Sequence, residues 1–520
     1  MTARRYPLGI QTFERIRREG LLYIDKTAHI YRMTHQSDTY VFLNRPRRFG
    51  KSLLVSTLQS YFEGKKELFD GLAISEMEKE WEQYPILHFS MAGGKHMKED
   101  ELERYLGYAL EDNEKLFGIK EHRNGANNRL ADLIRTEYEH TGKRVVVLID
   151  EYDAPLLDVV HDENALRTLR HVMRNFYSPL KDCEPMLRFV FLTGITKFSQ
   201  LSIFSELNNI SNISMDKEYA DICGITKEEM LTAMREDIAA LAKAQEMTAE
   251  EAVERLTRMY DGYHFSWPSP DIFNPFSLLN CFSRMQLSAY WFGSGTPTYL
   301  IEMMRKFEVT PSDVGDAMET KQSAFDAPTE HMIDITPLLY QSGYVTIKDY
   351  DKETDLYTLA IPNQEIRVGL FESLLPNYLG RVNTKGGVTI AKMSQKINRG
   401  DMDGALQMLQ DFLATVPYCN NTLYEGHYQQ MLYVIFTLLS PYRINVEQHT
   451  MKGRTDLTIE THDHVYIIEL KFGKSAAEAL EQIERSQYAQ AFALSEKPVT
   501  MVGINFNVKE ERNITEWVIK

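Results

Sequence analysis

The sequence predicts a multidomain α/β protein, with a doubly wound parallel sheet in its first half and a smaller α/β core at its C-terminal end. Three observations support this prediction. The chain has 520 residues, more than one hydrophobic core usually organises, so we expect two to four domains. Short apolar runs alternate with helical segments in the first half. After residue 424, a helix, three strands, a helix and a further strand follow in close succession.

The composition is that of an ordinary globular protein, with 43% apolar and 25% charged residues. The longest strongly apolar stretch, Met431 to Leu439, is far shorter than the roughly 20 residues of a membrane-spanning helix. The N-terminus shows no apolar segment of the kind found in secretory signals. We therefore expect a cytoplasmic protein that neither spans nor binds a membrane.

Charge and cysteine content narrow the classes of partner. The net charge of −16 argues against nonspecific coating of nucleic acid, because that affinity comes from lysine and arginine at phosphates. Any contact with nucleic acid must therefore be local. The four cysteines lie far apart and lack the CxxC spacing of a metal site, so we expect reduced thiols at Cys183, Cys223, Cys281 and Cys419.

A phosphate-binding loop is predicted where a strand leads into a helix. Residues 39–44 are β-branched and aromatic, and residues 52–62 carry apolar side chains at helical spacing. Between them, RPRRFGKS at residues 45–52 matches the second half of the pattern G-x-x-x-x-G-K-[ST], with Arg45 in place of the first glycine. The alternative is a basic loop that precedes a helix by chance.

The retained residues of this loop are those that bind a nucleotide. Gly50 lets the backbone approach the phosphates, and the amides that open the helix bind phosphate oxygens. Lys51 would neutralise the β- and γ-phosphates, and the Ser52 hydroxyl would ligate magnesium. The predicted cofactors are therefore ATP and Mg²⁺, and the predicted nucleotide-binding residues of the loop are Arg45, Arg47, Arg48, Phe49, Gly50, Lys51 and Ser52.

A second strand delivers two carboxylates. Lys143 to Glu151 (KRVVVLIDE) is a continuous apolar run, as expected of a buried parallel strand, and it ends in two acids. Asp150 would hold the magnesium ion, directly or through water. Glu151 would orient and deprotonate the attacking water, which requires a carboxylate within hydrogen-bond reach.

Two more candidate strands complete a four-stranded parallel sheet, whose ligand is expected at the carboxyl edge. They are residues 85–91 and 188–194. The second strand ends at Thr193 and continues to Thr196, polar groups that could sense the γ-phosphate. An ordinary strand end is an equally good interpretation of these threonines.

Several segments of this half resemble the AAA-ATPase-like family common in bacteria, in which an arginine-rich loop commonly replaces the first Walker glycine. The resemblance extends over the first 380 residues or so. It implies ATP binding and hydrolysis. The segments that carry it are YPLGIQTFERIRREGLLYIDKT (6–27), RPRRFGKS (45–52), LIDEYDAPL (148–156), FSELNNISNIS (204–214), YDGYHF (260–265), NPFS (274–277) and WFGSGTPT (291–298).

The middle of the chain is less specific. Residues 227–260 have the composition and spacing of two amphipathic helices, which suit a lid. The following stretch fits either a mixed or a winged-helix-like module. DNA contact by that module is one interpretation and core packing is the favoured one, because no Lys/Arg stripe is present. An arginine finger from a neighbouring subunit also remains open, and with it a homo-oligomer. Residues 381–423 read as a helical connector that breaks at Gly400 and Asp401.

The C-terminal order of elements is that of a restriction-endonuclease-like core. The expected helices are residues 424–439 and 476–493, and the expected strands are 443–450, 455–460, 464–472 and 499–507. Glu469 and Lys471 project to one face because side chains alternate along a strand, and an adjacent strand can bring Asp456 beside them. Two carboxylates suit magnesium, and the lysine can position or activate water, so phosphodiester hydrolysis is implied.

GRTDL (453–457), IIELK (467–471) and QIERSQYA (482–489) resemble the PD-(D/E)xK nuclease domain that is frequently joined to the ATPase family. The resemblance implies that Gln482 and Tyr488 line the site and that Glu425 is the acid of the first helix. Thr455 stands where the superfamily name has proline. The alternative is a surface hairpin with an E-x-K salt bridge.

The predicted domains are an ATPase domain at 1–226, a lid and mixed region at 227–380, a connector at 381–423 and a nuclease-like domain at 424–520. The leading hypothesis is an ATPase with a magnesium-dependent nuclease, acting on DNA more than on RNA. The alternative is an ATP-dependent switch whose nuclease-like domain binds nucleic acid or protein without cutting. A scaffold that binds nucleotide without hydrolysing it is disfavoured, because Glu151 is present. Defence, mobile-element biology and repair are not distinguished by the residues.

Overall fold

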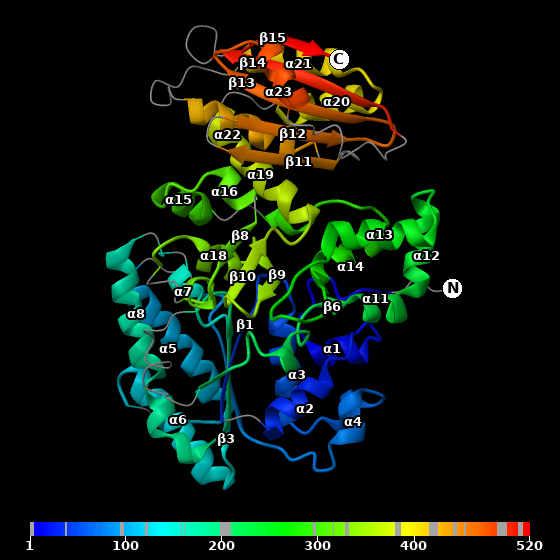
Figure 1. Cartoon of the computed structure of the whole chain (residues 1–520). Coiled ribbons are helices and arrows are strands. Elements are labelled where there is room, and N and C mark those ends of the chain that lie inside the picture. Colours follow the sequence, from blue (N-terminus) through cyan, green and yellow to red (C-terminus); the bar gives the residue numbers. More distant parts are fainter. Residues whose placement is uncertain are drawn as a thin grey trace. The chain divides into compact units, whose positions relative to one another are not determined.

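The computed structural model shows two compact units, which we describe separately (Figure 1). Unit 1 comprises Met1–Glu308 and Ala317–Asn363, and unit 2 comprises Val309–Asp316 and Gln364–Lys520. Within them, the structure describes residues 5–36, 39–93, 98–119, 123–157, 159–160, 162–197, 210–294, 298–315, 317–327, 332–379, 386–414, 425–439, 445–451, 454–485, 497–507 and 513–520.

Unit 1 is built on a five-stranded parallel sheet with the strand order β2-β3-β4-β1-β5. Four of the strands are those that the sequence predicts, so the predicted doubly wound parallel sheet is confirmed. The fifth, a short edge strand, was not predicted. The strands are β1 (Tyr40–Asn44), β2 (Ile86–Ser90), β3 (Val145–Asp150), β4 (Leu187–Gly194) and β5 (Ile210–Asn212).

Helices cover both faces of this sheet (Figure 1). The helices α5, α6 and α8 pack on one face, where their apolar stripes join the strands in one large core. The helices α1 to α4 lie on the other face. The bounds are α1 (Phe13–Arg18), α2 (Thr27–Gln36), α3 (Lys51–Phe62), η1 (Lys66–Phe69), α4 (Ala73–Met77), α5 (Glu99–Leu116), α6 (Ala126–Thr141), α7 (Ala154–Leu157), α8 (Glu163–Tyr177), α9 (Pro179–Asp182), η2 (Glu184–Met186) and η3 (Lys217–Tyr219).

The predicted lid forms a helical layer with its own apolar core. Residues 227–260 fold into three helices rather than the predicted two, and two of them begin with a capping box, at Thr226 and at Thr248. The elements are β6 (Ile225–Thr226), α11 (Lys227–Ala233), α12 (Arg235–Ala244), α13 (Ala249–Tyr260), β7 (Ile272–Phe273), α14 (Pro275–Arg284), η4 (Trp291–Ser294) and α15 (Thr298–Lys306).

Residues 317–363, which we call the 317–363 module, form a three-stranded antiparallel sheet with the strand order β8-β10-β9. Two short helices follow β8 in the sequence and precede β9. This order of elements is compatible with the winged-helix-like module that the sequence allowed beside a mixed one. Residues 337–341 of the second helix are buried, which favours core packing over DNA contact by this helix. The elements are β8 (Met318–Thr320), α17 (Gln322–Phe325), α18 (Thr336–Gln341), β9 (Thr346–Asp351) and β10 (Leu356–Ala360).

The segment at residues 261–264, which follows α13 of the lid, binds this module by hydrogen bonds. The His264 backbone N–H donates to the Thr346 hydroxyl (2.8 Å), and Lys348 Nζ donates to the Gly262 carbonyl (2.6 Å). The Asp261 side chain lies beside these contacts and is only 2% exposed. Burial raises the pKa of Asp261 to about 7.

This raised pKa predicts a pH-dependent stability that the Asp261→Asn variant will lack. The folded protein binds more protons than the unfolded chain between the ordinary pKa of 3.8 and the folded value of about 7. The stability that protonated Asp261 contributes is therefore full below pH 3.8 and is lost as the pH rises through about 7. Relative to Asp261→Asn, the wild type should lose on the order of 4 kcal/mol across this window in urea unfolding at stepped pH. Parallel curves for the two proteins would contradict the assignment.

Unit 2 contains a five-stranded mixed sheet with the order β11-β12-β13-β14-β15. Only the β13–β14 pair is parallel among its described pairings. Four helices and four strands lie where the sequence predicts them, although the last of these helices is described only to residue 485 of the predicted 493, and β15 was not predicted. The elements are α16 (Pro311–Gly315), α19 (Gln364–Leu379), α20 (Gly386–Asn398), α21 (Met402–Ala414), α22 (Glu425–Thr437), β11 (Asn445–Met451), β12 (Arg454–Glu460), β13 (Val465–Phe472), α23 (Ala476–Arg485), β14 (Val499–Asn507) and β15 (Asn513–Ile519).

The helix α23 packs closely on the parallel strand pair. Val465 and Ile467 of β13 form an apolar cluster with Ile483 of α23. A side chain at Gly503 of β14 would lie within 3 Å of the α23 backbone, so glycine allows this close approach. The same face of β13 carries Glu469 and Lys471, because side chains repeat with period two. The helix is thereby held next to the predicted nuclease residues.

Some predictions concern the chain as a whole. The boundaries predicted at residues 226, 380 and 423 divide the chain more finely than the two units and stay predictions. None of the helices in the described ranges has the length and apolar character needed to cross a bilayer. Cys183, Cys223 and Cys281 are buried free thiols, and Cys419 lies outside the described residues.

Candidate active sites

The predicted phosphate-binding loop connects β1 to α3 and has the backbone that such a loop requires. Gly50 precedes α3 with φ 95° and ψ 17°, a left-handed conformation that glycine adopts without steric cost. Lys51 opens the helix, and its side chain folds back over the loop. Its Nζ donates to the carbonyls of Arg45 (2.9 Å) and Pro46 (3.0 Å). Burial lowers the pKa of Lys51, and the nearby carboxylate of Asp150 opposes that shift.

A cavity of about 600 Å³ opens in front of this loop, within the size range of small-molecule sites. Its polar end brings the loop together with acids that follow β3. Its apolar end is formed by residues 7–11 and by α14, segments that carried the family resemblance but had no assigned role. The lining residues are Pro7, Leu8, Gly9, Ile10, Gln11, Arg47, Arg48, Gly50, Lys51, Ser52, Leu53, Ala92, Glu151, Asp153, Ala154, Leu157, Ile195, Pro275, Phe276 and Leu279.

The two predicted acids lie at the carboxyl end of β3. Asp150 is 6% exposed, and its Oδ1 has no hydrogen-bond partner among the described residues. Asp150 does not line the cavity, but its charge acts on Lys51 of the loop, and a buried carboxylate oxygen of this kind suits a hard cation such as Mg²⁺. The residues present therefore fit the implied metal.

Glu151 lines the cavity from a turn with φ 51°, a left-handed conformation that costs a non-glycine residue roughly 1–2 kcal/mol. Strain of this kind is often kept at functional sites. Burial raises the pKa of Glu151, and the negative charge of Asp150 adds to the effect. A raised pKa improves a carboxylate as a proton acceptor near neutral pH.

Asp153 is a site residue that the sequence interpretation missed. Its carboxylate is 1% exposed and accepts hydrogen bonds from the backbone N–H groups of Ile195 (3.0 Å) and Thr196 (2.6 Å). It also accepts from the Thr196 hydroxyl (2.8 Å), so this threonine is committed to Asp153 rather than to a phosphate. The hydroxyl of Thr193 is buried and has no hydrogen-bond partner within the described part of the chain.

Arg45, which replaces the first Walker glycine, does not line the cavity. Its guanidinium is buried, with 1% of the residue exposed, and donates to the carbonyls of Ser214 (2.7 Å) and Tyr219 (2.9 Å). It also lies over the Phe265 ring, 4.1 Å from the ring centroid. The prediction of a nucleotide contact for this side chain is therefore corrected to a structural role, because buried carbonyls hold the charged group away from the cavity.

Replacing Arg45 by the glycine of the Walker pattern should therefore destabilise the folded protein. We expect Arg45→Gly to lower the free energy of unfolding by about 3 kcal/mol, because it strands buried carbonyls and empties the space beside Phe265. Arg47→Gly is the matched control, since Arg47 is exposed in the same loop. Urea unfolding of both variants measures the difference. Equal stability of the two would overturn the structural role.

The remaining loop residues divide between cavity and core. Arg47 and Arg48 line the cavity, and the Arg48 guanidinium stacks 3.8 Å from the centroid of the Phe276 ring. Phe49 is 1% exposed and packs edge-on against Tyr263, with the ring centroids 4.8 Å apart. The predicted nucleotide contact of Phe49 is therefore corrected. The ring lies in the core behind the loop and holds the loop in place by packing.

In unit 2, three of the predicted nuclease residues come together. Lys471 Nζ lies 2.5 Å from Glu469 Oε1 and also donates to the side-chain oxygen of Gln482, from α23. Glu469 is 1% exposed and Lys471 is 6% exposed. The β12–β13 register places the backbone of Asp456 directly opposite Glu469. The side chains of Asp456 and Glu425, and all of Tyr488, lie outside the described residues.

This arrangement provides some of the groups that a metal-dependent hydrolase needs. Two carboxylate-bearing positions face each other across an antiparallel pair, and carboxylate oxygens are the ligands that Mg²⁺ prefers. The buried carboxylate of Glu469 therefore fits the implied cation as one donor. The surface-hairpin alternative does not describe Glu469 and Lys471, because both are buried under α23.

Comparisons with known proteins agree with both family resemblances of the sequence. Residues 7–204 match the family model described as predicted AAA-ATPase, and residues 423–517 match the PD-(D/E)XK nuclease superfamily. A protein of Azotobacter chroococcum mcd 1, named only as an uncharacterized protein in the vnfD 5′ region, is 32% identical over 532 residues. This alignment covers 100% of the present chain and 99% of the relative. The chain therefore belongs to the AAA-ATPase-like family and carries a PD-(D/E)XK nuclease superfamily domain at its C-terminal end.

Proposed function

We propose that the protein hydrolyses ATP in unit 1 and cleaves nucleic-acid phosphodiesters in unit 2, with a divalent metal at each site. One observation carries the proposal furthest. A single cavity gathers the loop residues Gly50, Lys51 and Ser52 with Glu151, although the loop and the acid are about a hundred residues apart in the sequence.

In the ATPase site, the loop amides and Lys51 would bind the triphosphate. Asp150 and Ser52 would hold Mg²⁺, which neutralises charge on the β- and γ-phosphates when bound. Glu151 would accept a proton from the attacking water, and its raised pKa means that turnover falls as the pH drops through that value. Thr193 offers a buried hydroxyl at the same strand edge.

In the nuclease site, Asp456 and Glu469 would hold a divalent cation, which polarises the phosphate when bound. Lys471 would position the attacking water, and Gln482 holds its ammonium in place from α23. DNA is the proposed substrate in preference to RNA. The proposal includes a homo-oligomer, a cytoplasmic location and a role in defence or mobile-element biology.

The alternative function is an ATP-dependent switch that binds nucleic acid without cutting it. The bond between Lys471 and Glu469 is the observation in its favour, because the ammonium neutralises a carboxylate that a metal would need. Cleavage requires that a metal, once bound, shares Glu469 with this lysine.

The wild-type chain separates these functions directly. Purified protein is incubated with linear, circular and single-stranded DNA and with RNA, with Mg²⁺, Mn²⁺ or EDTA, and with or without ATP. We expect ATP turnover and metal-dependent cleavage, both abolished by EDTA. ATP turnover with nucleic-acid binding but no cleavage in any metal would support the switch. Absence of ATP binding would remove the whole proposal.

A further inference from the structure

The turn that follows β4, residues 194–197, joins the two halves of the ATPase site. On one side, Asp153 of the cavity wall accepts hydrogen bonds from the turn, as described above. On the other side, the Arg45 N–H donates to the Gly194 carbonyl (3.2 Å), and the Asn44 side-chain amide donates to the Ile195 carbonyl (3.3 Å). The turn is therefore bonded both to the acidic turn after β3 and to the start of the phosphate-binding loop.

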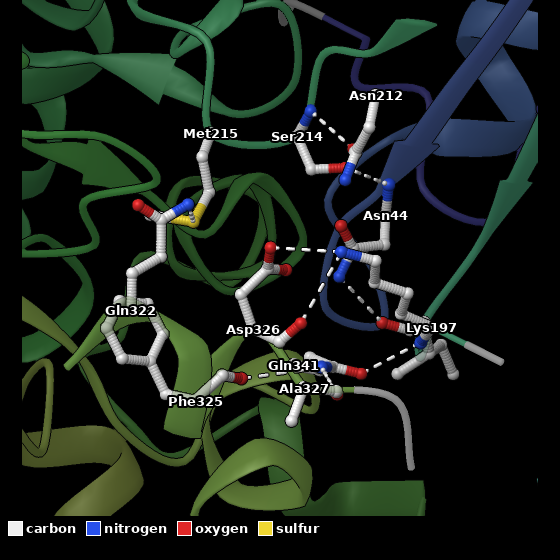
Figure 2. A network of polar contacts seen from close by, with 11 residues as sticks. Asn44, Lys197, Asn212, Ser214, Met215, Gln322, Phe325, Asp326, Ala327 and Gln341 are labelled. Carbon is white, nitrogen blue, oxygen red and sulfur yellow. Dashed lines mark hydrogen bonds and ion pairs between the residues drawn. The ribbon is translucent and has the colours of Figure 1, made fainter. Parts of the chain in front are cut away.

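The last residue of the turn, Lys197, binds the 317–363 module at two points. Its Nζ lies 3.1 Å from Asp326 Oδ2, and its backbone N–H donates to Gln341 Oε1 (2.8 Å). Figure 2 shows the lysine side chain reaching toward Asp326 while its backbone faces Gln341. The Gln341 amide in turn donates to the Ala327 carbonyl (2.9 Å), which fixes the glutamine.

These contacts are shielded from water. The Lys197 and Asp326 side chains are 22% and 14% exposed, and Gln341 is 2% exposed. An ion pair in such a place is screened less by salt than a surface pair. Hydrogen bonds thus tie Thr196 to the cavity wall at Asp153, and the next residue of the chain, Lys197, to the 317–363 module.

We propose that Lys197 is a positioning residue of the ATPase site, which with Asp326 and Gln341 of the 317–363 module holds the turn after β4 in its catalytic geometry. This inference rests on the proposed ATPase function. The described contacts of Lys197 go to the 317–363 module, whereas Gly50 and Lys51 line the cavity from the loop, so we expect the kcat for ATP to change more than the Kd for nucleotide. Hydrolysis should need Lys197, because the turn holds Asp153, which lines the cavity together with Glu151.

The test compares Lys197→Met, Asp326→Asn and the double variant in the full chain. We expect the kcat for ATP to fall roughly tenfold in each single variant, because small misplacements of site groups are costly. The double variant should be no slower than either single one, since both remove the same contact. The Kd for a fluorescent ATP analogue should stay within about twofold of the wild type. Lys197→Arg, which keeps the charge, should recover most of the rate.

Lys65→Met is the matched control, because Lys65 pairs with Glu14 (2.8 Å) in unit 1 without touching the turn. A wild-type kcat in Lys197→Met, while Lys51→Ala abolishes turnover, would overturn the inference and leave the ATPase assignment standing. Loss of analogue binding and of thermal stability together, in the double variant as well, would also overturn it in favour of a purely structural contact. Wild-type turnover in Lys51→Ala would instead defeat the proposed ATPase function.

Discussion

Glu151→Gln is expected to slow ATP turnover about a thousandfold while nucleotide binding persists, because general-base catalysis contributes on this order. Glutamine matches the shape of glutamate but cannot accept the proton of the attacking water. Glutamine also has a Cβ atom, so the backbone strain of the turn at φ 51° stays the same, whereas a glycine at this position would remove that strain. The variant therefore removes the proton acceptor without changing the backbone conformation of the turn. Single-turnover ATP hydrolysis and analogue binding measure the two quantities separately.

Two further variants make this test specific. Glu246→Gln is the matched control, because Glu246 also has a left-handed backbone, with φ 52°, and does not line the cavity. It should leave turnover unchanged. Lys51→Ala should lose binding as well as turnover, since its ammonium has no substitute at the phosphates. The wild-type rate should fall as the pH drops through the raised pKa of Glu151, and this limb should vanish in Glu151→Gln. Normal turnover in Glu151→Gln would exclude the residue as the base.

The sequence allowed prediction of those parts of the site whose chemistry is local. The apolar run before Asp150 and Glu151 could only be a buried strand, and the acids therefore had to lie at its carboxyl edge. The glycine before Lys51 likewise predicts a left-handed turn at a helix start, which the structure shows. Period-two alternation was enough to place Glu469 and Lys471 on one face.

The role of Arg45 could not be predicted, because its partners come from distant parts of the chain. The carbonyls that hold it belong to Ser214 and Tyr219, and the ring below it is Phe265. A motif position alone gives no sign that a charged side chain turns inward. Asp153 was missed for a related reason: it reads as one more acid after two predicted ones, and only the fold brings it to the turn at Thr196.

The limits of periodicity explain the missed elements. The edge strand β5 has only three residues, too few for an alternating pattern to be recognised. The strand β15 alternates only weakly between buried and exposed positions. In the lid, the break at Met234 between α11 and α12 carries no glycine or proline, so two helices were predicted where three form.

Lys471→Met is expected to reduce metal-dependent cleavage at least a hundredfold, because general acid–base groups contribute on that order, with ATP turnover unchanged. This variant alone would be ambiguous. Glu469 would lose its ammonium partner while 1% exposed, and breaking a buried pair costs about 3–5 kcal/mol. A loss of cleavage could then reflect a loss of folding in unit 2.

The double variant Glu469→Gln with Lys471→Met resolves the ambiguity. Replacing both members of a buried pair by neutral side chains is often nearly neutral for stability, so unit 2 should regain much of the lost unfolding free energy. Cleavage should stay absent, since both a metal ligand and the water-positioning ammonium are gone. Lys474→Met, at an exposed lysine in the bend that follows β13, is the matched control and should cut normally. Cleavage at the wild-type rate by the double variant would place the chemistry elsewhere in the chain, because this face of β13 would then carry neither the carboxylate that binds the metal nor the ammonium that positions the water.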